Sequence, residues 1–139
     1  MIRFVLDASV SLRWFLDASV PLYAIRVKQL LIGGAVAVVP ALWHLEMANG
    51  LVVAQRRGIL TAGDIDRSLL YLEQLLAQVI GSDPALISVR QSLATAQEFQ
   101  LSSYVASYLE TARRDNLPLA TLDQPLRAAA RKAGVELLM

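Results

Sequence analysis

The run Ile2-Arg3-Phe4-Val5-Leu6, followed directly by Asp7, is the stretch that decides the fold. A short and nearly continuous apolar run is typical of a strand buried in a parallel sheet. Similar apolar or β-branched runs recur along the chain, separated by segments with helical periodicity. We predict strands at 2–6, 36–39, 79–80, 119–122 and 135–138.

Helix caps and helix-ending residues mark the segments between these strands. Thr61 with Asp64 forms a capping-box pattern, and Asp83 precedes a first-turn proline. The predicted helices are 9–16, 21–31, 42–57, 61–77, 84–99, 102–115 and 125–133. Strands that alternate with helices require crossover connections and a parallel sheet covered on both faces. We therefore expect one α/β domain over residues 1–139, a three-layer α/β/α sandwich with a central, mainly parallel sheet.

Composition narrows the class of protein. The 139 residues are 55% hydrophobic, carry a net charge of +1 and include no cysteine, which excludes disulfides and thiolate zinc sites. The longest apolar stretch, 30–43, is interrupted by Gly33-Gly34 and Pro40 and is too short to span a bilayer. No secretory signal is recognisable, so we expect a cytoplasmic protein without membrane contact. The near-neutral charge argues against a broadly basic surface, and the high apolar content favours a face for self-association or a partner.

Three carboxylates stand where ligands bind in such folds. Asp7 and Asp123 each follow a predicted strand, and ligands of open α/β sheets bind outside the carboxyl ends of the strands. Either residue could instead serve only as a helix N-cap. Glu46 lies among apolar residues of a predicted helix, where a charge is costly unless it is paired, bound to a cation or placed at the edge of the face. Carboxylates that converge without matching arginines favour Mg²⁺ or Mn²⁺.

Four stretches in the same order carry a resemblance to a known family. The chain resembles the PIN-domain ribonucleases of the VapC type, the toxins of bacterial type II toxin–antitoxin systems, over essentially its whole length. The matching stretches are Val5-Leu6-Asp7-Ala8-Ser9-Val10, Pro40-Ala41-Leu42-Trp43-His44-Leu45-Glu46-Met47-Ala48-Asn49, Leu117-Pro118-Leu119-Ala120-Thr121-Leu122-Asp123, and Gly134-Val135.

The resemblance implies a metal-dependent endoribonuclease. By it, Asp7, Glu46 and Asp123 are catalytic residues that hold Mg²⁺ or Mn²⁺, and the metal lowers the pKa of a water that attacks an RNA phosphodiester. It also implies a homodimer and a cognate VapB-like antitoxin that covers the acidic cleft. Residues expected to support the three acids are Ser9, Asn49 and Thr121.

One position departs from the family pattern. The family carries a further acid in a Tyr-Asp-Ala sequence, whereas this chain reads Tyr104-Val105-Ala106. Valine can neither ligate a metal nor carry charge, so divalent binding should be weaker than in the family. Three explanations remain open: an inactive variant, a naturally degenerate paralogue, or an enzyme that works with one metal on the remaining acids.

Two other functions are alternatives to the nuclease. A haloacid-dehalogenase-like phosphatase also begins with a strand and an aspartate, but its motif needs a second aspartate where this chain has Ser9. A PIN module that binds RNA or antitoxin without cleavage is favoured by Val105. His44 points to a different helix face from Glu46, so we expect it to be structural. Tyr104 and Tyr108 could stack on bases, although aromatics at helical spacing are more often core.

Overall fold

A four-stranded, all-parallel sheet lies at the centre of the computed structural model, which describes residues 1–139. Its strands are β1 (Arg3–Leu6), β2 (Val36–Val39), β3 (Ile80–Ser82) and β4 (Leu119–Ala120), in the order β3-β2-β1-β4. The helices are α1 (Ala8–Ser11), α2 (Arg13–Leu16), α3 (Leu22–Ile32), α4 (Ala41–Arg56), α5 (Ala62–Gln78), α6 (Val89–Phe99), α7 (Ser103–Asp115) and α8 (Gln124–Ala133). The fold is thus α/β, as predicted.

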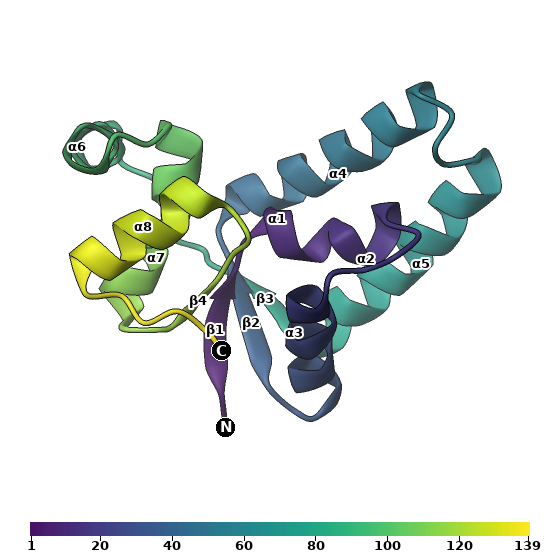
Figure 1. Cartoon of the computed structure of the whole chain (residues 1–139), viewed down its shortest axis with the longest axis horizontal. Coiled ribbons are helices and arrows are strands. Elements are labelled where there is room, and N and C mark those ends of the chain that lie inside the picture. Colours follow the sequence, from purple (N-terminus) through teal and green to yellow (C-terminus); the bar gives the residue numbers. More distant parts are fainter.

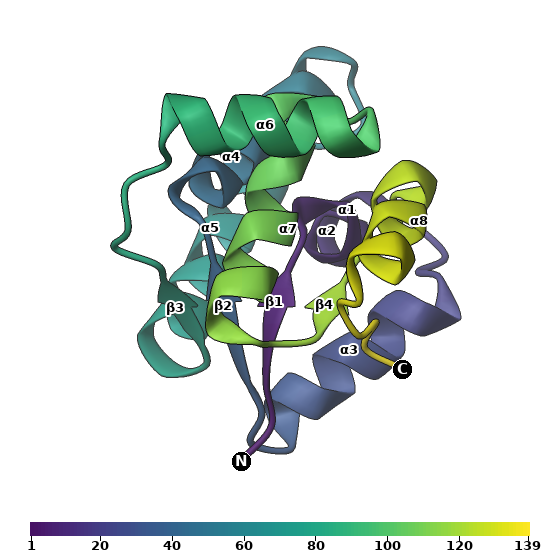
Figure 2. The same ribbon diagram turned by 90° about the vertical axis from the view of Figure 1, so that its left-hand side faces the viewer.

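Helices cover both faces of the sheet. Figure 1 shows α6, α7 and α8 on one side of the strands and α2, α3, α4 and α5 on the other. The turned view in Figure 2 shows α7 passing in front of the strands and α6 lying across α7. This arrangement confirms the three-layer α/β/α sandwich that the alternation of strands and helices predicted.

The strand order creates a switch point between β1 and β4. From β1 the chain adds β2 and then β3 on one side, and it returns over the opposite face to place β4 on the other side of β1. Parallel pairing sets Val5 against Leu119 and Leu6 against Ala120. The carboxyl ends of two strands from opposite ends of the sequence therefore meet, at the place where open α/β sheets bind ligands.

Most of the predicted helix ends are confirmed by their hydrogen bonds. The capping box at Thr61 is complete, with the side chains of Thr61 and Asp64 each accepting a backbone N–H. Ser102 caps α7 by accepting from the N–H of Val105. Asn116 and Gly134 end α7 and α8 in the left-handed conformation, and Gln100 ends α6 in the same way.

The predicted helix 84–99 begins five residues late, at Val89. Asp83 does not cap it, because the Asp83 carboxylate accepts from the N–H of Ala85 and pairs with Arg114 at 2.5 Å. Ser88 caps α6 instead, by accepting from the N–H of Gln91. A tertiary ion pair has therefore overridden a local helix-start signal, and residues 83–88 form a loop.

The strands at the C-terminal end are shorter than predicted. Of the predicted strand 119–122, only Leu119–Ala120 is paired, and the Thr121 side chain that follows bonds Asp7 and the N–H of Asp123. The predicted strand 135–138 is reduced to an isolated parallel bridge between Leu119 and Leu137. Within the helix predicted at 9–16, the chain forms two short helices, α1 and α2.

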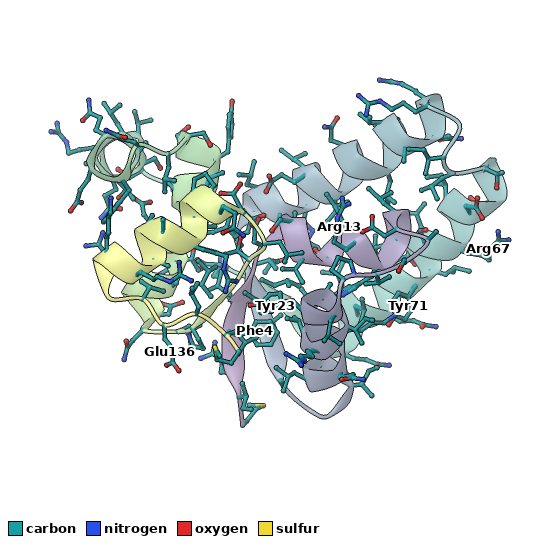
Figure 3. The ribbon with its side chains drawn as sticks, in the orientation of Figure 1. Phe4, Arg13, Tyr23, Arg67, Tyr71 and Glu136 are labelled. Carbon is teal, nitrogen blue, oxygen red and sulfur yellow. The ribbon has the colours of Figure 1, made fainter.

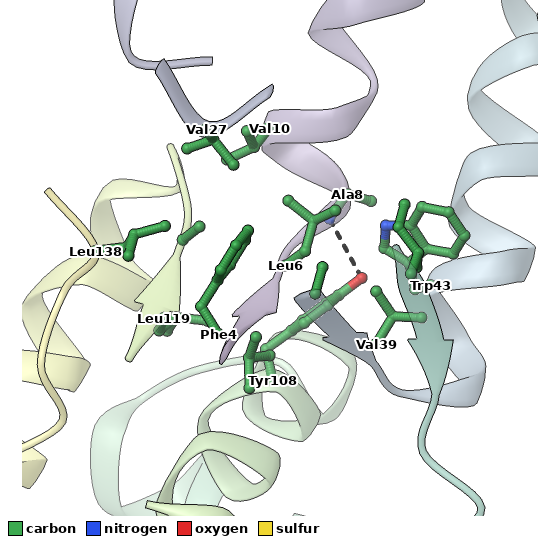
Figure 4. Close-up of a cluster of buried hydrophobic side chains, with 14 of the residues drawn as sticks. Phe4, Leu6, Ala8, Val10, Val27, Val39, Trp43, Tyr108, Leu119 and Leu138 are labelled. Carbon is green, nitrogen blue, oxygen red and sulfur yellow. Dashed lines mark hydrogen bonds between the residues drawn. The ribbon is translucent and has the colours of Figure 1, made fainter. Parts of the chain in front are cut away.

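The core lies between the sheet and both helical layers. Figure 4 shows Phe4, Leu6, Val39 and Trp43 among its fully buried side chains. The buried indole N–H of Trp43 donates to the Ser11 hydroxyl at 3.0 Å, so the polar edge of this ring is satisfied. None of the helices combines the length and apolar character that crossing a bilayer requires.

Truncation of Phe4 tests how strongly the core depends on β1. Phe4 is fully buried, so Phe4→Ala should lower the free energy of unfolding by about 3–5 kcal/mol through lost transfer energy and a residual cavity. Leu86→Ala is the control, because Leu86 is 97% exposed, and it should change stability by less than about 0.5 kcal/mol. Urea unfolding monitored by circular dichroism measures both. Equal losses in the two variants would contradict this placement of the core.

Candidate metal centre

Asp7 is a buried carboxylate at the switch point. Its backbone N–H donates to the carbonyl of Ala120 at 3.0 Å and so continues the pairing of β1 with β4 by one residue. The residue is only 6% exposed, and its Oδ2 accepts hydrogen bonds from Ser9 Oγ and Thr121 Oγ1, both at 2.7 Å. It occupies the N-cap position of α1 but makes no capping bond with its side chain. The N-cap interpretation therefore fails for Asp7, and its carboxylate serves the network around it.

The hydroxyls of Ser9 and Thr121 tie the loop after β4 to the loop after β1. Ser9 Oγ accepts from the N–H of Leu122 at 2.9 Å while it donates to Asp7. Thr121 Oγ1 accepts from the N–H of Asp123 at 3.0 Å while it donates to Asp7. Each hydroxyl thus uses its single proton on the carboxylate and a lone pair on a backbone N–H of the loop after β4. Two of the three predicted supporting residues, Ser9 and Thr121, are therefore in contact with Asp7.

Asp123 lies at the N-cap of α8. Its Oδ2 accepts from the N–H of Leu126 at 2.9 Å, so the capping interpretation is correct for this residue. Capping occupies one oxygen, and Oδ1 makes no hydrogen bond with the protein. Burial raises the pKa of Asp7, hydrogen bonds from Thr121 and Ser9 oppose the rise, and the nearby charge of Asp123 adds to it.

Glu46 reaches the same region from α4. It is half-buried, and its Oε1 accepts a hydrogen bond of 2.5 Å from the hydroxyl of Tyr108 on α7. Burial raises the pKa of Glu46, the Tyr108 bond lowers it, and the charge of Asp7 raises it again. The charge of Asp7 therefore acts on the Glu46 carboxyl.

Tyr108 is the residue of this site that sequence reasoning missed. Its side chain is 1% exposed, which rules out base stacking, and its hydroxyl oxygen also accepts from the N–H of Ala8 at 3.4 Å, as Figure 4 shows. The available signal was a tyrosine on an apolar helix face, because a buried phenol needs a hydrogen-bond partner. The identity of that partner, 62 residues away in the sequence, is a product of the tertiary fold.

Some of the predicted site residues are not brought together. Asn49 is exposed on α4, one turn after Glu46, and makes no hydrogen bond with the other site residues. No group of three or more Asp, Glu or His side chains is placed closely enough to hold one metal ion as a ready-made set. Each of the three acids instead directs one oxygen to a protein donor.

The chemistry of the donors nevertheless fits a hard divalent cation. None of the three acids forms an ion pair with lysine or arginine, because the ion pairs of the protein all lie elsewhere. The oxygens Glu46 Oε2 and Asp123 Oδ1 have no protein donor, and the hydrogen-bonded oxygens of the three acids accept from hydroxyls and one backbone N–H. Oxygen ligands of this kind suit Mg²⁺ and Mn²⁺.

Other candidate residues have structural partners. His44 Nε2 lies 2.6 Å from Ser82 Oγ and so links α4 to β3, in agreement with the structural role expected for it. Arg13, labelled in Figure 3, pairs with Asp17 at 2.8 Å within the turn that ends α2. Trp14 donates its indole N–H to the carbonyl of Ala24 at 2.8 Å. These side chains hold helices together.

The fold and the site define an α/β protein with a buried carboxylate, Asp7, at its topological switch point. A solved structure of similar fold is described as "Crystal Structure of PAE2754 from Pyrobaculum aerophilum"; it aligns with a TM-score of 0.66 and 23% sequence identity, over 92% of this chain and 84% of that one. At this identity the likeness concerns the fold alone. No family model matches the sequence, and no curated protein matches it.

The buried carboxyl of Asp7 predicts a pH dependence of stability. Because burial raises its pKa above the ordinary 3.8, the folded state binds this proton more tightly than the unfolded state. The free energy of unfolding should therefore fall as pH rises from about 4 through the raised pKa. The free energy of unfolding of Asp7→Asn should depend less steeply on pH than that of the wild type. The dependence that remains should come from Glu46, whose pKa is also raised.

Urea unfolding of the wild type and Asp7→Asn in a chelator-containing buffer, at a series of pH values, measures the two slopes. Identical slopes would show that the Asp7 carboxyl is not the buried acid responsible.

Proposed function

We propose that this chain is a PIN-type endoribonuclease of the VapC kind that cleaves RNA phosphodiesters with Mg²⁺ or Mn²⁺. The observation that carries the proposal is the setting of Asp7. This carboxylate is 6% exposed, lies within electrostatic reach of Asp123 and Glu46, and has no basic side chain paired with it. Like charges gathered in this way are stabilised by a cation, since burial of unpaired charge is otherwise costly.

The residues of the site would have two kinds of role, as cation ligands and as residues that orient a ligand. Asp7, Glu46 and Asp123 would hold the cation, which when bound supplies a water of lowered pKa and neutralises charge on the scissile phosphate. Ser9 and Thr121 orient Asp7 through hydrogen bonds of 2.7 Å. Both hydroxyls are anchored to backbone N–H groups, so they keep Asp7 in one orientation without moving when a ligand arrives.

Val105 supports a second candidate function, a PIN module that binds RNA or an antitoxin without cleaving. Val105 is at the start of α7, one helical turn before Tyr108, and it packs against the core. Residues three apart lie on the same side of a helix, so an apolar side chain stands beside the tyrosine that contacts Glu46. The position expected to carry a further acid in the family therefore adds no charge to the site.

The exposed apolar surface supports the proposed protein partners. A homodimer and a VapB-like antitoxin both need faces that remain uncovered in the single chain. Large hydrophobic side chains that stay exposed on the helices and on the loop before α6 are Leu22, Ile25, Ile32, Leu45, Leu69, Leu70, Leu86, Ile87, Val89, Leu93 and Tyr104.

RNA cleavage with Mn²⁺ by the wild type and by Val105→Asp separates the two functions. We expect Val105→Asp to cleave faster than the wild type, because a fourth carboxylate strengthens cation binding. Asp123→Asn, which removes a proposed ligand, should reduce cleavage by about 100-fold or more, exceeding the 10–100-fold typical of outer-shell changes. Gel electrophoresis of a labelled RNA measures the rates.

Val105→Asn is the matched control, because it has the shape of aspartate without the charge. Cleavage by both the wild type and Val105→Asp would rule out the non-cleaving module. Cleavage by Val105→Asp alone would identify Val105 as the lesion. If neither protein cleaves, the assignment of the three acids is wrong.

A further inference from the structure

The hydroxyl of Tyr108 connects three elements at the acidic site. Tyr108 belongs to α7, its oxygen accepts from the N–H of Ala8 at the start of α1, and its proton goes to Glu46 on α4. An ionised carboxylate only accepts hydrogen bonds, so the direction of the Tyr108–Glu46 bond is determined. Tyr108 is 1% exposed, so its hydroxyl depends on partners within the protein.

Of the three acids, Glu46 alone has a single donor from another element, because the one hydrogen bond to the Asp123 carboxylate comes from its own helix. Asp7 is held by two hydroxyls, and Asp123 is held by the first turn of α8. The Glu46 carboxylate, in contrast, receives one hydrogen bond from the protein, at 2.5 Å from Tyr108, and makes no ion pair. The side chain of Glu46 has several rotatable bonds, so without this donor its carboxylate is free to turn toward solvent.

We infer that Tyr108 is the positioning residue for Glu46: its buried hydroxyl holds the Glu46 carboxylate beside Asp7 and leaves Oε2 available to a cation. The inference rests on the proposed function of the acidic site as a divalent-cation site. The positioning of Glu46 by Tyr108 matters more in this chain because Val105, in the turn of α7 before Tyr108, supplies no carboxylate. The contribution of α7 to the site is then the orientation of Glu46.

The test is a double-mutant cycle on Mn²⁺ affinity, measured by titration calorimetry on the wild type, Tyr108→Phe, Glu46→Gln and the double variant. Loss of an outer-shell partner typically weakens metal binding by about 10–100-fold, and we expect a loss of that size for Tyr108→Phe. In the Glu46→Gln background the same change should have no further effect, because Tyr108 acts through Glu46. Tyr104→Phe is the matched control: it removes a hydroxyl from the same helix at a residue that is 65% exposed, and it should bind like the wild type.

Each other result overturns a defined statement. Wild-type affinity in a folded Tyr108→Phe overturns the positioning role and leaves the proposed function intact. If Tyr108→Phe lowers Mn²⁺ affinity equally in the wild-type and Glu46→Gln backgrounds, the positioning role is also overturned, because Tyr108 would then act through the fold in general. If the wild type binds no Mn²⁺, the proposed function fails and this inference fails with it.

A second measurement covers the case in which Tyr108→Phe does not fold, since Ala8 loses the acceptor of its N–H. The wild-type protein is titrated with Mg²⁺, and carbon-13 NMR follows the Glu46 carboxyl carbon and the hydroxyl-bearing ring carbon of Tyr108. Signals that shift together, with one affinity, support the link. A Glu46 signal that shifts while the Tyr108 signal stays unchanged overturns it.

Discussion

The burial of the Asp7 carboxylate is the constraint on which the rest of the site depends. A charge in this position requires donors, and the protein supplies them from two loops that are more than a hundred residues apart in the sequence. Ser9 comes from the loop after β1, and Thr121 comes from the loop after β4. Satisfying one carboxylate therefore holds together the two strand ends that form the switch point.

The topology of the sheet makes this meeting possible. Because β4 returns to the side of β1 opposite β2, the chain places its last strand next to its first strand. Asp123 can then cap α8 and still lie near enough to Asp7 to raise its pKa. The Asp123 side chain thus uses one oxygen to stabilise a helix and leaves the other without a protein donor.

Helix starts were predicted correctly from the local sequence where the expected capping hydrogen bond formed. The capping box at Thr61 and the cap at Ser102 need only their own helices, and both are present. Asp83 shows the opposite case. Its predicted role as a helix cap is lost to an ion pair with Arg114, which is 31 residues away and comes near only through the packing of α7.

By itself, the sequence determined the alternation of strands and helices, the α/β class and the carboxylates that follow β1 and β4, because apolar periodicity and caps are local properties. The tertiary structure alone decided which polar groups satisfy those carboxylates. Tyr108 illustrates the difference: its spacing marked it as a core residue, yet its hydroxyl reaches Glu46 on another helix. A buried polar atom must find a partner, and only the packing of the folded chain determines which partner is within reach.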